Sequence, residues 1–278
     1  YKNIKRVFTS HDLMPFTRPD LAPKSFAKLL KPAYDSIDRE TKVICVSEFT
    51  KSELLNYRKD LDENQVEVVY LGADKNTFFP NLSKTKFLLL SKKYNFKFEK
   101  YLLCLNRNQK YKNTEHIIEA YIMVVNDNIN SDLGLVLIGT FDNFETKKRF
   151  IDKYKQYKNI HFIEYVPDVE LSIFYSNALS FIYMSLYEGF GLPVIEAMQC
   201  GTPIISSNQA SLPEVVKGYG ICMDPFDVEL LSHQICSIMN DSVLARKLSI
   251  QSLERSNFFS WEKNLAETIK VYKKAIYN

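Results

Sequence analysis

The chain has 278 residues, of which 46% are hydrophobic and 25% charged, so it is long enough for one large or two ordinary globular domains. Its net charge is only +3 and the basic residues are spread along the chain, which excludes a strongly basic nucleic-acid-binding surface. The five cysteines form no C-x-x-C pair and the four histidines show no ligand spacing. We therefore expect reduced thiols, a cytoplasmic protein and no metal site. No apolar run of the sequence approaches the ~20 residues that span a bilayer.

The first third of the chain alternates short apolar runs with helical segments. We predict strands at residues 6–9, 42–46 and 66–70, and helices that begin at Lys24 and directly after Ser47, the residue that caps the second helix. The first strand ends in Ser10-His11-Asp12, and a polar cluster just past a strand end lies where open α/β sheets bind ligands. The lysines of the helix from Lys24 are expected on a solvated face, and peripheral contact with acidic lipid is the second interpretation.

From Tyr101 onward, strands and helices alternate regularly. The predicted strands are residues 101–105, 135–138, 160–163, 180–184, 203–205 and 220–223. The predicted helices are residues 86–94, 114–125, 145–155, 169–177 with Asp168 as the cap, a short one from Pro193, 212–216, 228–239, 242–254 and a last one that follows Phe258-Phe259-Ser260-Trp261. This alternation predicts a parallel sheet that is covered by helices on both faces.

The stretch from Tyr183 to Ser206 carries the strongest functional signal. It predicts a buried strand, a polar loop from Ser185 to Leu192, a short helix opened by Pro193 and a second strand. Gly189 and Gly191 leave backbone amides uncovered at the start of this helix. Uncovered amides at a helix N-terminus form a geometry that binds anions.

Two carboxylates bracket these glycines. Glu188 precedes them and Glu196 lies one turn into the helix, so both are able to face a ligand that lies across the helix N-terminus. The segment from Glu188 to Glu196 resembles the E-x7-E signature of retaining, metal-independent glycosyltransferases of GT-B fold, of the family 4 or group 1 type. Residues 197–203 match the continuation of that family's motif.

The resemblance implies roles for these residues. In that family the first Glu lies against the donor sugar, the G-F-G-L backbone meets the sugar and phosphate, and the second Glu holds the ribose hydroxyls. These roles fall on Glu188, on Gly189, Phe190, Gly191 and Leu192, and on Glu196. The family's His-Asp pair points its His into the cleft between the domains, and His11 matches it. Without the resemblance, Glu196 would only complement the helix dipole and His11 would be an ordinary strand-end residue.

A second motif follows the first strand of the second domain. Residues 105–113 resemble the family's G-R/T-x-x-x-x-K-N pattern, whose Arg and Lys grip the donor diphosphate. Arg107, Lys112 and Asn113 match this pattern, whereas Asn106 replaces the usual Gly. An Arg and a Lys at the carboxyl edge of a sheet are able to neutralise a diphosphate without a metal.

Three further positions complete the predicted donor site. Tyr165 and Val166 follow a strand at the point where the family's backbone contacts the nucleobase, although Glu164 replaces a customary Gly. Ser185 matches the Ser of the family's P-S-x-x-E-G segment, with Met184 in place of the Pro.

The resemblance covers nearly the whole chain and implies an α/β fold of the GT-B type. We place a partial N-terminal Rossmann-like domain at residues 1–82, a complete C-terminal nucleotide-sugar-binding domain at residues 83–256, and a helix that crosses back to the N-terminal domain at residues 257–278. Complete domains of this type have ~150 residues. We therefore expect a missing segment or a partner chain to cover exposed sheet edge and to complete the acceptor side.

The predicted function is a retaining glycosyltransferase that moves a hexosyl group from a UDP- or GDP-sugar to a hydroxyl of a glycan or lipid-linked acceptor. Polysaccharide biosynthesis in the cytoplasm or at the inner face of the membrane is the expected setting, with no further cofactor. The catalytic set is Glu188, His11, Arg107 and Lys112. The alternatives are a catalytically silent nucleotide-sugar-binding subunit and a GT-B epimerase or phosphorylase. A nicotinamide-linked enzyme fits poorly, because no G-x-G-x-x-G follows a first strand.

Overall fold

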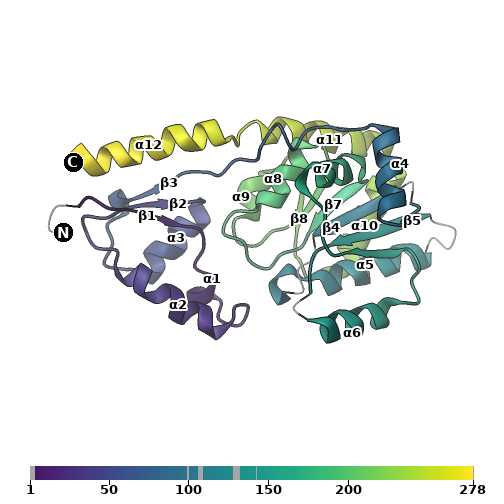
Figure 1. The fold of residues 1–278 in the computed structure, drawn as a ribbon, viewed down its shortest axis with the longest axis horizontal. Coiled ribbons are helices and arrows are strands. Elements are labelled where there is room, and N and C mark those ends of the chain that lie inside the picture. Colours follow the sequence, from purple (N-terminus) through teal and green to yellow (C-terminus); the bar gives the residue numbers. More distant parts are fainter. Residues whose placement is uncertain (1–3, 99, 106–108, 128–131, 142, 278) are drawn as a thin grey trace.

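The computed structural model describes residues 4–98, 100–105, 109–127, 132–141 and 143–277, and within them the chain forms two parallel sheets. The smaller sheet has the order β1 (Val7–Ser10), β2 (Lys42–Cys45) and β3 (Val66–Val68). The larger sheet has six strands in the order β6-β5-β4-β7-β8-β9. Figure 1 shows the two sheets in separate lobes, with α12 (Trp261–Tyr277) running from the larger lobe along the smaller one.

The larger lobe is a three-layer α/β unit. Its strands are β4 (Lys100–Leu105), β5 (Leu133–Ile138), β6 (Ile160–Ile163), β7 (Ser180–Tyr183), β8 (Ile204–Ser207) and β9 (Ile221–Met223). Its helices are α4 (Lys84–Lys93), α5 (Thr114–Asp127), α6 (Phe144–Tyr154), α7 (Asp168–Asn177), α8 (Leu192–Gln199), α9 (Leu212–Val216), α10 (Val228–Asn240) and α11 (Ser242–Ser256). The predicted parallel α/β class is thus confirmed.

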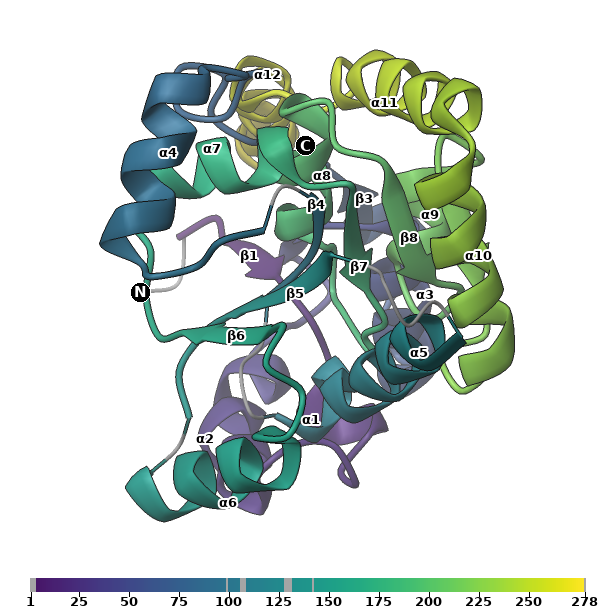
Figure 2. The same ribbon diagram turned by 90° about the vertical axis from the view of Figure 1, so that its right-hand side faces the viewer.

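Alternate residues of the central strand β4 face opposite layers of the larger lobe. Tyr101 and Leu103 belong to a core with residues of α7 and α8, whereas Leu102 and Cys104 belong to a core with residues of α5 and α10. Figure 2 shows α7 and α8 on one face of this sheet and α5 and α10 on the other. Because both faces are buried, the strands are continuous apolar runs and β5 has no exposed residue.

The smaller lobe packs helices on both faces of its three strands. Ile44 of β2 packs with Val271 of α12 on one face. Val43 and Cys45 form a second core with residues of α2 (Lys24–Asp35) and α3 (Glu48–Tyr57) on the other face. A four-residue helix, α1 (Met14–Thr17), follows β1 and had no counterpart among the predicted elements. None of the helices in the described residues is both long and apolar enough to span a membrane.

The predicted starts of two helices and one strand need correction. Pro167 precedes α7 in an extended conformation, so Asp168 is already the first helical residue and is not the cap. Its carboxylate therefore complements the helix dipole from the first turn. Helix α8 begins at Leu192, with Pro193 inside its first turn. Strand β8 begins only after Pro203, which has no N–H to donate to a ladder.

Candidate functional site

A cleft of about 420 Å³ lies where the carboxyl ends of the two sheets face one another. In the larger sheet the strand order reverses between β4 and β7, and such a switch point leaves a crevice beyond the strand ends. The chain that follows β1 and β2 supplies the opposite wall. The cleft brings together most of the predicted site residues: His11, Lys112, Glu188, Gly189, Phe190, Gly191, Leu192 and Glu196.

The loop between β7 and α8, residues 185–191, forms the floor of this cleft and is called the glycine loop here. Gly191 has a φ of 111°, a conformation that L-residues with a side chain rarely adopt, and it leads directly into α8. The hydroxyl of Ser211 donates to the carbonyl oxygens of Glu188 (3.0 Å) and Phe190 (2.7 Å). These bonds fix the loop from the side of α9.

Lys112 and Glu188 form a buried ion pair in the cleft. The Lys112 Nζ lies 2.6 Å from the Glu188 Oε1, and the side chains are only 9% and 15% exposed. The Tyr183 hydroxyl accepts from Lys112 Nζ (2.5 Å) and donates to Glu188 Oε1 (2.8 Å). The ammonium also lies over the rings of Tyr111 and Tyr183, at 4.9 and 4.7 Å from their centroids. The charge pair is therefore supported on several sides.

Tyr183 was not predicted as a site residue. It is fully buried, and burial together with the Glu188 carboxylate raises its pKa, so the hydroxyl stays protonated and is able to donate. It is the last residue of β7, and only Met184 separates it from the glycine loop. Its position at the strand end is the only sequence signal for this role. The apolar run that contains it is equally typical of a tyrosine that only packs in the core.

Glu196 lies on α8 at the other end of the cleft. Burial raises its pKa from 4.5 to about 7, and the Tyr175 hydroxyl donates to its Oε2 over 3.3 Å. Of the two glutamates in the cleft, Glu188 is thus neutralised by a lysine, whereas Glu196 has its pKa raised by burial. The bonds from Lys112 and Tyr183 both end on Glu188 Oε1, so Glu188 Oε2 and the Glu196 carboxylate are able to accept further hydrogen bonds.

His11 and Asp12 reach the cleft from the end of β1. His11 is exposed, and its backbone carbonyl lies against Gly189. Asp12 is half-buried and its Oδ1 accepts a hydrogen bond from the Met14 N–H (3.0 Å). Burial raises the pKa of Asp12, and the nearby Glu188 adds to this effect. The predicted His-Asp pair therefore lies at the contact between the lobes.

The remaining predicted residues that the structure describes do not line the cleft. Arg107 falls outside the described residues. Tyr165 is exposed, whereas Val166 and Ser185 are buried. Asn113 adopts a left-handed conformation at the end of a 3-10 turn, and its side chain donates to the Pro225 carbonyl over 2.7 Å. Asn113, Tyr165 and Val166 are therefore not part of the hydrogen-bonded group around Glu188, whereas the Ser185 hydroxyl lies beside Tyr183.

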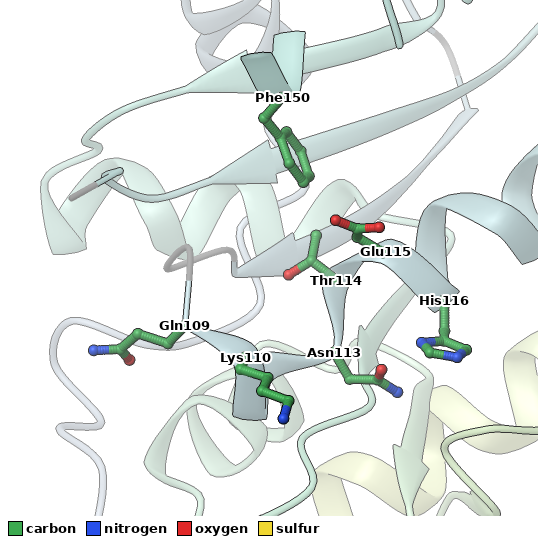
Figure 3. Close-up of a pocket in the computed structure, with 7 residues that line it drawn as sticks. All are labelled: Gln109, Lys110, Asn113, Thr114, Glu115, His116 and Phe150. Carbon is green, nitrogen blue, oxygen red and sulfur yellow. The ribbon is translucent and has the colours of Figure 1, made fainter. Parts of the chain in front are cut away.

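Asn113 lines a second, smaller cavity of about 240 Å³ at the start of α5. Figure 3 shows Asn113 and His116 on one side of it, Gln109 and Lys110 on the segment that precedes α5, and Phe150 of α6 across from them. His116 packs edge-on against Phe226, with ring centroids 5.4 Å apart. Within the described residues, no group of three His, Cys, Asp or Glu side chains is arranged to hold a metal ion.

Gly189 lies in close contact with the smaller lobe. A Cβ built there would lie 1.9 Å from the His11 carbonyl oxygen and 2.9 Å from the Asp12 Cβ. Since the obstruction includes backbone, Gly189→Ala is expected to lower the free energy of unfolding by about 1–3 kcal/mol, the usual cost of overpacking. Urea denaturation measures this loss, and an unchanged midpoint and slope would contradict the contact.

Two parallel α/β lobes that face one another across a cleft define a protein of the GT-B class of glycosyltransferase folds. Residues 88–255 match the family model for the glycosyl transferases group 1, and the chain belongs to this family. It is 31% identical over 275 residues to the O-antigen chain mannosyltransferase B of Escherichia coli, covering 97% of this chain and 70% of that protein.

A second relative is a serotype-specific mannosyltransferase, WbdA, also of Escherichia coli. It is 26% identical over 262 residues, which are 92% of this chain but only 32% of that longer protein. Among solved structures, a glycosyltransferase from Rickettsia africae has a TM-score of 0.78 and 24% identity, covering 98% of this chain and 71% of that one. A sucrose-phosphate synthase from Thermosynechococcus elongatus has a TM-score of 0.76 and 23% identity, covering 98% and 68%. These structures show the fold.

Proposed function

We propose that the chain transfers a hexosyl group, most specifically a mannosyl group, from a nucleoside-diphosphate sugar to a hydroxyl of a glycan, with retention at the anomeric carbon and without a metal. Membership of the group 1 family supports transfer of a sugar. The two Escherichia coli relatives described above are both named mannosyltransferases, and the name of one refers to the O-antigen chain. These names support a mannosyl donor and a polysaccharide acceptor.

The observation that carries the proposal is the composition of one cleft. It combines the carboxylates of Asp12, Glu188 and Glu196 with a lysine and the start of α8. The free amides at the start of α8 suit the diphosphate of the donor, because a helix N-terminus attracts anions. Glu196 suits the ribose, because an ionised carboxylate accepts hydrogen bonds from two neighbouring hydroxyls. His11 would then meet the sugar from the smaller lobe.

Lys112 has two roles in this proposal. An ammonium group has three N–H donors, and the structure uses two of them on Glu188 and Tyr183. The third is left for a phosphate oxygen, so the lysine would hold Glu188 in place and still stabilise the charge that develops on the leaving diphosphate. Glu188 would then orient the sugar next to that phosphate.

Calorimetric titration of the 278-residue chain with UDP-glucose, GDP-mannose and ADP-glucose tests the donor site. We expect binding of one nucleotide class, weakened about tenfold or more by Glu196→Ala, since hydrogen bonds to a charged group contribute roughly 1.5–3 kcal/mol. The matched control is Glu254→Ala, an exposed glutamate on α11. Arg107→Ala tests the part of the predicted phosphate clamp that lies outside the described residues.

Failure of all three sugars to bind to the folded chain would overturn the proposed donor site. Binding without any release of nucleoside diphosphate, with or without a mannose-containing acceptor, would favour the catalytically silent subunit. Transfer with inverted anomeric configuration in the product, read by NMR, would contradict retention.

A further inference from the structure

The start of α3 in the smaller lobe holds the glycine loop of the larger lobe from the side opposite Ser211. The Ser47 hydroxyl donates to the Gly189 carbonyl over 2.7 Å, and the Thr50 hydroxyl donates to the same oxygen over 3.0 Å. Both side chains are fully buried. A backbone carbonyl directly beside Glu188 thus receives two hydrogen bonds from the other lobe.

The same helix start is also bound by α9. Glu214 Oε1 accepts from the Glu48 N–H over 2.9 Å, and its Oε2 is 3.3 Å from the Phe49 nitrogen. A carboxylate suits this place, because the first amides of a helix are unpaired and the helix dipole is positive there. The Arg255 guanidinium holds α9 by donating hydrogen bonds to the backbone carbonyls of Glu214 (2.9 Å) and Val215 (2.8 Å). The contact is therefore built from both lobes.

The arrangement makes the shape of the glycine loop depend on the contact between the lobes. Ser211 holds the carbonyls of Glu188 and Phe190 from within the larger lobe. The carbonyl between them is held only by groups of the smaller lobe among the hydrogen bonds of the described residues. Separating the lobes would release Gly189 while its neighbours stay bound.

We propose that Thr50 and Glu214 are positioning residues that organise the glycine loop, and with it Glu188, only when the lobes are in contact. The expected effect on sugar transfer rests on the proposed function, whereas the hydrogen bonds between the lobes do not depend on it. Nucleotide contacts through Glu196 and α8 belong to the larger lobe alone. Loss of the Thr50 hydroxyl should therefore slow turnover more than it weakens nucleotide binding.

The test compares Thr50→Val with Thr50→Ser and Thr41→Val. Valine has the shape of threonine but lacks the hydroxyl, and serine retains it. Thr41 is a buried threonine of the same lobe whose hydroxyl donates to Asp38 over 2.7 Å, away from the cleft, so its replacement reports general loss of stability. Ser47 is unsuitable as the first target, because its hydroxyl also caps α3 by accepting from the Thr50 N–H.

Hydrogen exchange of the segment 185–192 is measured in the ligand-free protein, together with the affinity for UDP, GDP or ADP and the rate of donor turnover. For Thr50→Val we expect exchange in this segment to rise and turnover to fall by about three- to tenfold, the size of one hydrogen bond. Affinity for the nucleoside diphosphate should stay within about twofold. Thr50→Ser should restore both readouts, and Thr41→Val should leave exchange in the segment unchanged.

Exchange that does not change in Thr50→Val, or that changes equally in Thr41→Val, would overturn the positioning role. If Thr50→Val is unstable, Glu214→Gln provides the second variant, since it weakens the bond to α3 without removing a buried group. Exchange that responds as expected in a chain that binds none of UDP, GDP and ADP would uphold the positioning role and reject the proposed function.

Discussion

Lys112→Met is expected to destabilise the protein by about 3–5 kcal/mol, because it leaves the Glu188 carboxylate buried without its counterion. The two side chains are 9% and 15% exposed, so water cannot replace the ammonium well. Methionine retains most of the length of lysine, which limits the effect of a cavity. Urea denaturation at pH 8, where the glutamate is ionised in the unfolded chain, measures this loss.

A double variant separates the charge effect from a packing effect. Lys112→Met combined with Glu188→Gln removes both charges, and most of the lost stability should return, because the coupling between contacting buried charges is large. The matched control is Lys153→Met, which breaks the pair with Glu115 at 2.6 Å, where the side chains are 52% and 54% exposed. This control should cost at most about 1 kcal/mol. Additive effects in the double variant would contradict a coupled pair.

The glycine loop and its two glutamates were predictable from sequence, because local spacing determines them. The nine residues from Glu188 to Glu196 place a flexible loop at a helix start whatever surrounds them. The parallel sheet was predictable for a similar reason, since regular alternation of strands and helices allows few other arrangements. Helix ends were less certain, as the Pro167–Asp168 boundary shows.

The partners of these residues were not predictable, because they come from distant parts of the chain. Lys112 was predicted to face a diphosphate, yet it lies against Glu188, 76 positions further along. Glu214 meets the start of α3 across 166 positions. No local pattern encodes such contacts, since they depend on the strand order of the larger sheet and on how the lobes meet. His11 likewise reaches the cleft only because β1 ends beside Gly189.

Glu196→Gln is expected to stabilise the protein at high pH while it weakens nucleotide binding. Burial raises the pKa of Glu196 from 4.5 to about 7. Between these two values the folded protein retains a proton that the unfolded chain has lost, so this group makes the folded state less stable as the pH rises through that range. Glutamine has the same shape and no charge, and it avoids this cost.

The stability difference between Glu196→Gln and the unaltered chain should therefore be small near pH 4.5 and grow to roughly 3 kcal/mol above pH 7, since each pKa unit corresponds to 1.36 kcal/mol. Urea denaturation at pH 5, 6, 7 and 8 measures it, with Glu254→Gln as the exposed control. A stability difference that stays constant across this pH range would contradict the raised pKa of Glu196.

Nucleotide affinity should increase as Glu196 loses its proton, because only the ionised carboxylate accepts hydrogen bonds from both ribose hydroxyls. Between pH 6 and 8, the affinity of the unaltered chain should increase more steeply than that of Glu196→Gln. In the variant, only the nucleotide and the other ionisable groups of the protein titrate. Equal slopes in the two proteins would separate Glu196 from the ribose.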